Sequence, residues 1–81
     1  MLELYQAETC PYCARVRQEL DDLGLSYIIH NRSNEESLQK LVKLGGKAQV
    51  PMLVDQHHDL MLYESEDIIS HLQKNYSKKA S

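Results

Sequence analysis

The stretch Thr9-Cys10-Pro11-Tyr12-Cys13 places two cysteines three residues apart, between segments with different hydrophobic periods. Before it, residues 2–5 alternate apolar and polar side chains, which is typical of a strand. After it, residues 12–23 carry apolar side chains at helical spacing, with Pro11 suited to the first turn and Gly24 to the end. The two cysteines are therefore predicted to lie where a strand passes into a helix.

The middle of the sequence repeats this alternation of strand and helix. Residues 25–29 are rich in strand-forming side chains and follow the first helix after a short link. Ser33 and Glu36 have the spacing of a capping box, ahead of apolar residues at three- and four-residue steps as far as Leu44. Gly45-Gly46 ends this second helix. A right-handed crossover would make the first two strands parallel neighbours.

The last third predicts a hairpin followed by a third helix. Residues 52–54 and residues 60–63 are apolar and flank a polar turn that contains His57 and His58, so we expect two antiparallel strands. Ser65 is predicted to cap the final helix, whose first turn is acidic.

Length and composition indicate one folded domain. The chain has 81 residues, of which 42% are hydrophobic and 26% charged, and these are ordinary globular values. Two separate cores would each be too small for independent stability without disulfides or metals. We therefore predict a single α/β domain over residues 1–81, with the order β-α-β-α-β-β-α, a four-stranded mixed sheet and three flanking helices. Residues 77–81 are predicted to form a frayed tail.

The charge and the hydropathy pattern exclude some classes of partner. A formal net charge of -3 provides no excess of cations for a phosphate backbone, so no nucleic-acid partner is expected. No apolar stretch approaches the roughly 18 residues of a membrane span, and the first residues lack the features of a signal peptide. We expect a cytoplasmic protein with no membrane partner.

The position of Cys10 favours redox chemistry. At the start of a helix, free amide groups and the positive end of the helix dipole favour a negative sulfur, which lowers the thiol pKa and makes Cys10 the expected nucleophile. Cys13 lies one turn further on, where Cβ atoms are about 5–6 Å apart, and a disulfide between the two can close with little adjustment. Among the reduced thiols of the cytoplasm, such a pair is more often catalytic or metal-binding than structural.

Zinc binding by the cysteines is the alternative. A tetrahedral site needs two further ligands, and the sequence has no second Cys-x-x-Cys pair. The remaining soft ligands are four histidines without diagnostic spacing: His30, His57, His58 and His71. We predict no metal site, and interpret His57-His58 as part of a solvated turn.

Two motifs resemble glutathione-dependent proteins. The stretch from Thr9 to Cys13 resembles the active-site signature of dithiol glutaredoxins, and residues 45–51 resemble their Thr-Val-Pro segment with Gln49 in place of Thr. Residues 62–68 are more similar to the Glu-Ser segment in the glutathione-binding domain of glutathione transferases. The resemblance covers essentially the whole chain. It implies a thioredoxin-like fold, catalytic Cys10 and Cys13, and glutathione as co-substrate without a tightly bound cofactor.

The resemblance also implies a glutathione site. Pro51 is expected to follow a cis peptide bond, with the backbone of Val50 binding the cysteinyl part of glutathione as an added strand would. Ser65 and Glu66 are expected to bind the γ-glutamyl end, the carboxylate at the helix start and the ammonium group at an acidic side chain. Tyr12, with its ring beside the sulfur, and Gln49 complete the predicted site.

One departure concerns the glycyl carboxylate of glutathione. Many dithiol glutaredoxins carry a Lys shortly before the active-site Thr, where this chain has Ala7. Lys47 is the predicted substitute, with Lys40, Lys43 and Arg15 as further candidates.

The expected activity is the reduction of protein disulfides and glutathione mixed disulfides, by a monomer whose partners are glutathione and disulfide-bearing or glutathionylated proteins. Three alternatives stay open: a dedicated electron donor to ribonucleotide reductase, a glutathione-bridged [2Fe-2S] carrier that uses Cys10 of two subunits, and a non-catalytic glutathione-binding module. Many transferases use Ser or Tyr where this chain has Cys10, which distinguishes the chain from a typical transferase domain.

Overall fold

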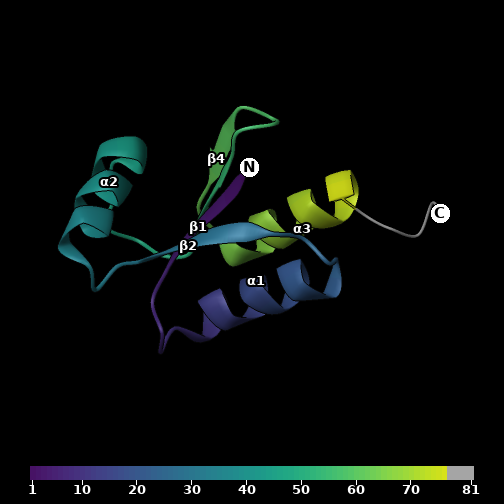
Figure 1. The fold of residues 1–81 in the computed structure, drawn as a ribbon, viewed down its shortest axis with the longest axis horizontal. Coiled ribbons are helices and arrows are strands. Elements are labelled where there is room, and N and C mark those ends of the chain that lie inside the picture. The colour runs from purple at the N-terminus through teal and green to yellow at the C-terminus, as the bar shows by residue number, and fades with distance from the viewer. Residues whose placement is uncertain (77–81) are drawn as a thin grey trace.

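The computed structural model describes residues 1–76. Within them the predicted order of elements is confirmed (Figure 1). The elements are β1 (Leu2–Gln6), α1 (Pro11–Asp22), β2 (Tyr27–Asn31), α2 (Glu35–Gly45), β3 (Met52–Asp55), β4 (Leu60–Leu62) and α3 (Ser65–Tyr76). The predicted frayed tail, residues 77–81, lies outside the described residues.

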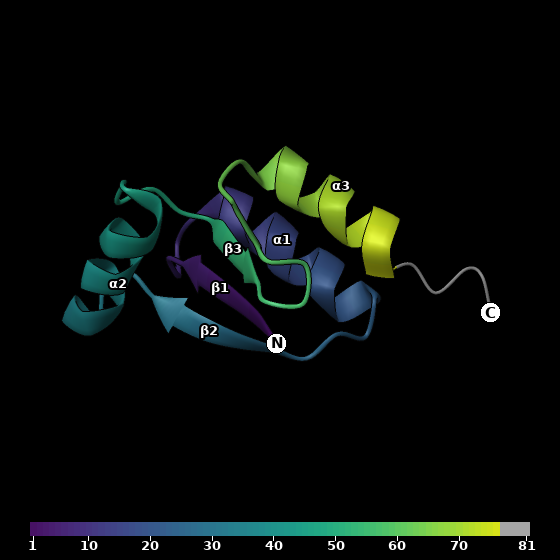
Figure 2. The same cartoon turned by 90° about the horizontal axis from the view of Figure 1, so that it is seen from above.

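The four strands form one mixed sheet in the order β2-β1-β3-β4. β1 runs parallel to β2 and antiparallel to β3, and β4 returns antiparallel beside β3. Seen from above, α1 and α3 lie together on one side of the sheet, and α2 lies apart from them (Figure 2). This is a thioredoxin-like α/β fold, as predicted.

The two faces of the sheet bury cores of unequal size. Alternation along β1 directs Leu2 and Leu4 towards α1 and α3, and Tyr5 towards α2. The larger cluster, under α1 and α3, comprises Leu2, Leu4, Val16, Leu20, Leu53, Ile68 and Leu72. The smaller cluster, under α2, comprises only Tyr5, Leu41 and Met52 as fully enclosed residues. The paired helices α1 and α3 are thus held more firmly than α2.

The second strand lies two residues later than predicted. The amide of Leu25 donates to the carbonyl of Leu20 (3.0 Å), and that of Gly24 donates to Asp21 (3.0 Å). With Gly24 at a φ of 69°, this is a Schellman ending of α1. Leu25 therefore belongs to the helix ending and packs against the larger core, and β2 begins at Tyr27.

The predicted caps of the second and third helices were also displaced. Asn34, not Ser33, caps α2: its side chain accepts the amide of Ser37 at 3.0 Å. At the start of α3 the amide of Ile68 donates to the carbonyl of Glu64 (2.9 Å). Ser65 is therefore the first residue of the helix and not the capping residue before it.

All three helices are short. α1 and α3 have 12 residues each and α2 has 11. None of the helices formed by residues 1–76 is long and apolar enough to cross a membrane.

Candidate functional site

Cys10 is the capping residue of α1. Its Sγ accepts a hydrogen bond from the backbone amide of Cys13 at 3.2 Å, and Pro11 occupies the first position of the helix. Both cysteines are free thiols; Cys10 is partly exposed and Cys13 is fully buried. The two sulfur atoms therefore occupy the strand-to-helix junction predicted for them.

The two thiols have opposite tendencies to ionise. Burial raises the pKa of Cys10, but hydrogen bonds from Cys13 and the amide of Tyr12, together with the charge of Arg32, outweigh it, so the pKa of Cys10 lies below its usual value. Burial, the hydrogen bond to Cys10 and the negative charge of Cys10 raise the pKa of Cys13 to about 11. Of the two thiols, Cys10 is thus the one that loses its proton more readily.

Arg32 is a functional candidate that the sequence interpretation missed. Its charge lowers the pKa of Cys10, and its Nη1 donates to the carbonyl of Ala48 at 3.3 Å. A usable signal was present, because Arg32 directly follows β2. The carboxyl ends of the parallel strands β1 and β2 lie at the same edge of the sheet, which is also where Cys10 lies.

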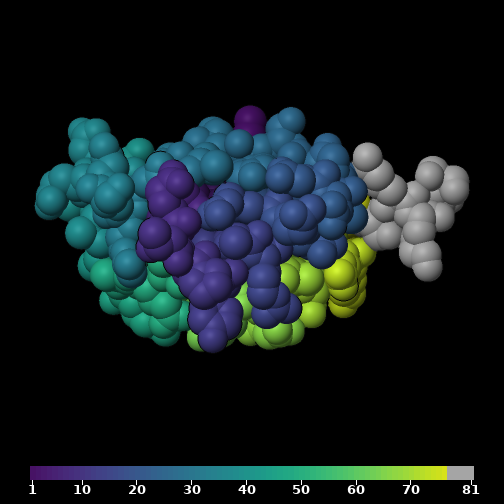
Figure 3. Space-filling view, turned by 90° about the horizontal axis from the view of Figure 1, so that it is seen from below, coloured from purple at the N-terminus to yellow at the C-terminus, as the bar shows by residue number. Residues whose placement is uncertain are grey.

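A cavity of about 370 Å³ contains nearly all of the predicted glutathione-binding residues. The surface of the first helix and of the loop before it, purple to blue, lies beside the yellow-green surface of α3 (Figure 3). The peptide bond between Val50 and Pro51 is cis, as the resemblance implied. The residues that line the cavity are Tyr12, Gln49, Val50, Pro51, Glu64, Ser65 and Glu66.

Polar contacts join separate elements around the cavity. Gln49 donates to Glu64 at 3.2 Å, which joins the segment before Pro51 to the start of α3. Arg15 on α1 forms an ion pair with Glu66 at 3.0 Å, and both side chains are more than half exposed. Glu66 thus already has a positively charged partner, and an incoming ammonium group would compete with Arg15.

Lys47 does not line this cavity. Its backbone exchanges two hydrogen bonds with the hydroxyl of Tyr63, which donates to the carbonyl at 2.9 Å and accepts from the amide at 3.2 Å. Its Nζ lies 4.8 Å from the centre of the Tyr63 ring. The ring also packs against Gly45, where an added Cβ would come within 2.0 Å of the hydroxyl oxygen. Lys47 and Gly45 therefore belong to the support of the segment that leads to Pro51.

A larger cavity, of about 410 Å³, lies between the end of β2 and α2. It contains no cysteine, and its lining is polar: His30, Asn34, Glu36, Ser37, Gln39, Lys40 and Lys43. We take the smaller cavity as the candidate functional site, because Tyr12 in its wall lies only two residues from Cys10, the thiol with the lowered pKa.

The prediction that His57-His58 forms a merely solvated turn was wrong for His58. His58 and His71 both contact the carboxylate of Asp55, at 2.8 Å and 2.7 Å. This cluster could not be recognised from sequence spacing, because the fold brings the end of β3 against the middle of α3.

Comparison with known proteins identifies the family. Residues 4–80 match the sequence model described as "Glutathione S-transferase, N-terminal domain". The chain belongs to this family. Glutaredoxin 3 of Escherichia coli (strain K12) is 32% identical over 59 residues, which are 70% of this chain and 71% of that protein. Prostaglandin E synthase 2 of Mus musculus is 36% identical over 74 residues, or 89% of this chain.

Solved structures show the same relationship. The glutathione transferase URE2P6 from Phanerochaete chrysosporium, in complex with oxidized glutathione, superposes with a TM-score of 0.80 at 27% identity over 96% of this chain. The chain spans 37% of that transferase and 19% of the mouse prostaglandin synthase. It thus matches part of these longer proteins and most of glutaredoxin 3, and both the matching family and the superposed transferase are described by their names as glutathione-linked.

Proposed function

We propose that the chain catalyses glutathione-dependent thiol–disulfide exchange, with Cys10 as nucleophile and Cys13 as resolving thiol. The observation that carries this proposal is the position of Cys10 Sγ at the start of α1, where it accepts the amide of Cys13 and has a lowered pKa. The family membership supports a glutathione-linked role, and glutaredoxin 3 among the relatives favours exchange over conjugation.

The first step is attack of the Cys10 thiolate on a disulfide. With a glutathionylated protein, an S–S bond forms between Cys10 and glutathione, and the protein leaves as a thiolate that takes up a proton. A second glutathione thiolate then attacks the glutathione sulfur of this intermediate. The products are oxidised glutathione and the free Cys10 thiolate, so the two electrons come from glutathione.

With a protein disulfide, Cys13 resolves the intermediate. The charge of Cys10 and the hydrogen bond to its sulfur both raise the pKa of Cys13 in the reduced protein. Both effects disappear once Cys10 is bonded to the substrate, so Cys13 becomes easier to ionise at the moment it is needed. Its attack forms the Cys10–Cys13 disulfide and releases the reduced substrate, and two glutathione molecules then restore the dithiol.

The cavity beside Tyr12 is the proposed glutathione site. The backbone of Val50 would pair with the cysteinyl part, and the free amides at the start of α3 would bind the γ-glutamyl carboxylate. Glu66 would receive the ammonium group in place of Arg15. Arg32 is now a better candidate than Lys47 for the glycyl carboxylate, because its charge acts on Cys10 whereas Lys47 lies over Tyr63.

The decisive experiment is the reduction of a glutathione mixed disulfide, coupled to glutathione reductase. We expect the wild-type protein to be active, Cys10→Ser to lose at least about a thousandfold in rate, and Cys13→Ser to keep most of it, because glutathione can replace the resolving thiol. Equal activity in wild type and Cys10→Ser would rule the mechanism out. Activity only with thioredoxin reductase would favour a dedicated electron donor.

Conjugation of glutathione to an electrophile is the second candidate. It is favoured by the match to the transferase family and by the superposition with a solved glutathione transferase. An assay with an aromatic electrophile distinguishes the two functions: conjugation that persists in Cys10→Ser would point to a transferase, whereas exchange without conjugation supports the oxidoreductase. A monomeric state in the cytoplasm stays a prediction.

A further inference from the structure

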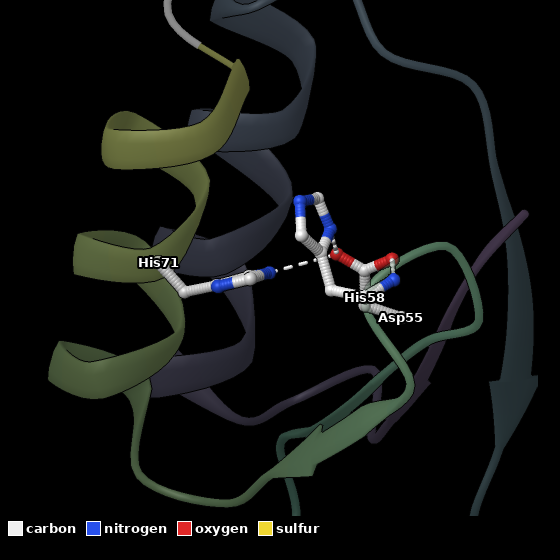
Figure 4. Close-up of side chains that lie close together, drawn as sticks. All are labelled: Asp55, His58 and His71. Atoms are coloured by element: carbon white, nitrogen blue, oxygen red, sulfur yellow. Dashed lines mark hydrogen bonds and ion pairs between the residues drawn. The ribbon is translucent and has the colours of Figure 1, made fainter.

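A cluster of one carboxylate and two imidazole side chains lies at the other end of the sheet from Cys10. Asp55, the last residue of β3, pairs with Leu2 at the start of β1, whereas Cys10 follows the end of β1. The carboxylate of Asp55 is fully buried, and it faces two imidazoles (Figure 4). One imidazole comes from the turn after β3 and the other from α3.

The two oxygens of Asp55 have different partners. Oδ1 accepts the backbone amide of His58 at 3.2 Å and closes the turn. Oδ2 accepts His58 Nδ1 at 2.8 Å, His71 Nε2 at 2.7 Å and the hydroxyl of Tyr76 at 2.9 Å. One oxygen therefore holds the backbone, while the other faces three polar side-chain atoms.

The buried carboxylate has no permanently charged partner among residues 1–76. Within the described part of the chain its only ion pairs are with the two histidines. The carboxylate is fully buried and accepts hydrogen bonds from the side chains of His71, Tyr76 and His58. With neutral imidazoles the cluster carries a net negative charge, which a bound cation would compensate.

We propose that Asp55, His58 and His71 bind a divalent transition-metal ion, with Zn²⁺ as the expected one. One carboxylate oxygen and two imidazole nitrogens suit zinc, and the three ligand atoms all lie within 4.8 Å of one another. Ligand atoms around tetrahedral zinc are about 3.3 Å apart, as bonds of about 2.0–2.1 Å require. The contacts to Oδ2 must therefore each open by about half an ångström, and the part-exposed His58 gives room for this.

The surrounding hydrogen bonds define the proton movements that zinc binding requires. Asn75 Nδ2 lies 3.0 Å from His71 Nδ1, which assigns the proton of the neutral ring to Nε2, facing Asp55. Coordination through Nε2 moves this proton to Nδ1, and the amide of Asn75 turns so that its oxygen accepts it. Coordination through Nδ1 of His58 likewise requires its neutral ring to carry the proton on Nε2.

The ion would join parts of the fold that are now connected by hydrogen bonds. His58 belongs to the turn between β3 and β4, and His71 lies on α3. The hydroxyl of Tyr76 can keep donating to the carboxylate, which it contacts at 2.9 Å. The fourth coordination position is left to water at the open side of His58. Zinc should therefore raise thermal stability.

The test uses untagged protein with Cys10→Ser and Cys13→Ser, so that the thiols cannot bind the metal. Calorimetric titration with Zn²⁺ should give one ion per chain, and Co²⁺ should give the visible absorption of a tetrahedral site without thiolate ligands. His58→Gln and His71→Gln should each weaken Zn²⁺ binding by about tenfold or more. His57→Gln is the matched control, because His57 adjoins His58 but is outside the ligand set; its affinity should not change.

His58→Gln is the primary variant, since this side chain is 30% exposed and its replacement should leave the fold intact, as a circular dichroism spectrum would verify. The proposal is overturned if the protein shows no Zn²⁺ binding at concentrations up to about 1 mM. A dissociation constant of that size corresponds to a standard binding free energy of only about -4 kcal/mol. It is equally overturned if folded His58→Gln binds as tightly as the parent protein, or if His57→Gln weakens binding as much as His58→Gln does.

Discussion

The two ends of the sheet hold a negative charge in opposite ways. At one end, the sulfur of Cys10 is partly exposed and is held by amides at the start of α1 and by a more distant arginine. At the other, the carboxylate of Asp55 is buried and accepts four hydrogen bonds. The thiol of Cys10 has an open approach and only partly satisfied hydrogen bonding, as the proposed nucleophile requires, whereas the enclosed carboxylate of Asp55 contributes to stability.

Replacing Asp55 should produce the largest effect on stability. Asp55→Asn leaves donors from His58, His71 and Tyr76 without a charged acceptor, and we expect a loss of about 3 kcal/mol in the free energy of unfolding. Exchange through Cys10 should be unchanged at temperatures where the variant is folded. Urea unfolding followed by circular dichroism measures the first quantity, and the mixed-disulfide assay the second.

Asp59→Asn is the control, because it makes the same chemical change at an exposed position of the same turn. Its stability should stay within about 0.5 kcal/mol of the wild type. If Asp55→Asn also changed the free energy of unfolding by so little, the buried hydrogen bonds would contribute little to stability. The proposed contrast between the Asp55 end and the Cys10 end of the sheet would then be wrong.

Gly45→Ala should disturb the end of the sheet near Cys10, because Gly45 and Tyr63 support the segment that leads to Pro51. The new methyl group would meet the hydroxyl and ring of Tyr63, so we expect a loss of about 2 kcal/mol. We also expect a raised KM for glutathione, because the segment from Lys47 to Pro51 comes just after this position and contains part of the proposed glutathione site. If the clash is the cause, Gly45→Ala should cost less in a Tyr63→Ala background; additive losses would contradict it.

Low pH should reduce the contribution of Asp55 to the free energy of unfolding. Because folding lowers the pKa of Asp55, its contribution is fully present above the unfolded pKa of about 3.9 and is lost as pH falls towards the folded pKa. The difference in unfolding free energy between wild type and Asp55→Asn should therefore shrink below pH 4, by about 1 kcal/mol. Urea titrations of both proteins at pH 6, 4 and 3 would measure it; a constant difference would contradict the assignment.

Arg32→Gln should have the smallest effect. Removing this charge raises the pKa of Cys10, so the exchange rate should fall about two- to fivefold at acidic pH and recover in alkaline solution. Lys40→Gln, an exposed cation on α2, should leave the pH profile unchanged. A uniform decrease at all pH values would instead place Arg32 in substrate binding.

Local signals in the sequence predicted the fold well. Pro11, Gly24 and Gly46 lie at helix boundaries, and hydrophobic period distinguished the strands from the helices between them. The errors came from competition between neighbouring signals. Ser33 and Asn34 are both good capping residues, and Leu25 has the composition of a strand although the ending of α1 uses it.

The candidate site was predicted through motifs, and the remainder depended on tertiary contacts. Cys10, Cys13 and the residues around the cis Pro51 belong to recognisable local patterns, so the sequence located them. The cluster of Asp55, His58 and His71 has no such pattern, because His71 reaches the other two only when α3 packs against the end of β3. Glu64 was missed for a similar reason: its contact with Gln49 spans 15 positions of the chain.

The small core under α2 has a consequence for motion. Only Tyr5, Leu41 and Met52 are fully enclosed there, while Val42 and Leu44 on the same helix are more than 40% exposed. Amide hydrogens of α2 should therefore exchange with deuterium earlier than those of α1 and α3, through local opening that leaves the larger core intact. Only residues 46–48 separate α2 from Gln49 and Val50, so each such opening would also loosen one wall of the proposed glutathione cavity and allow product to leave.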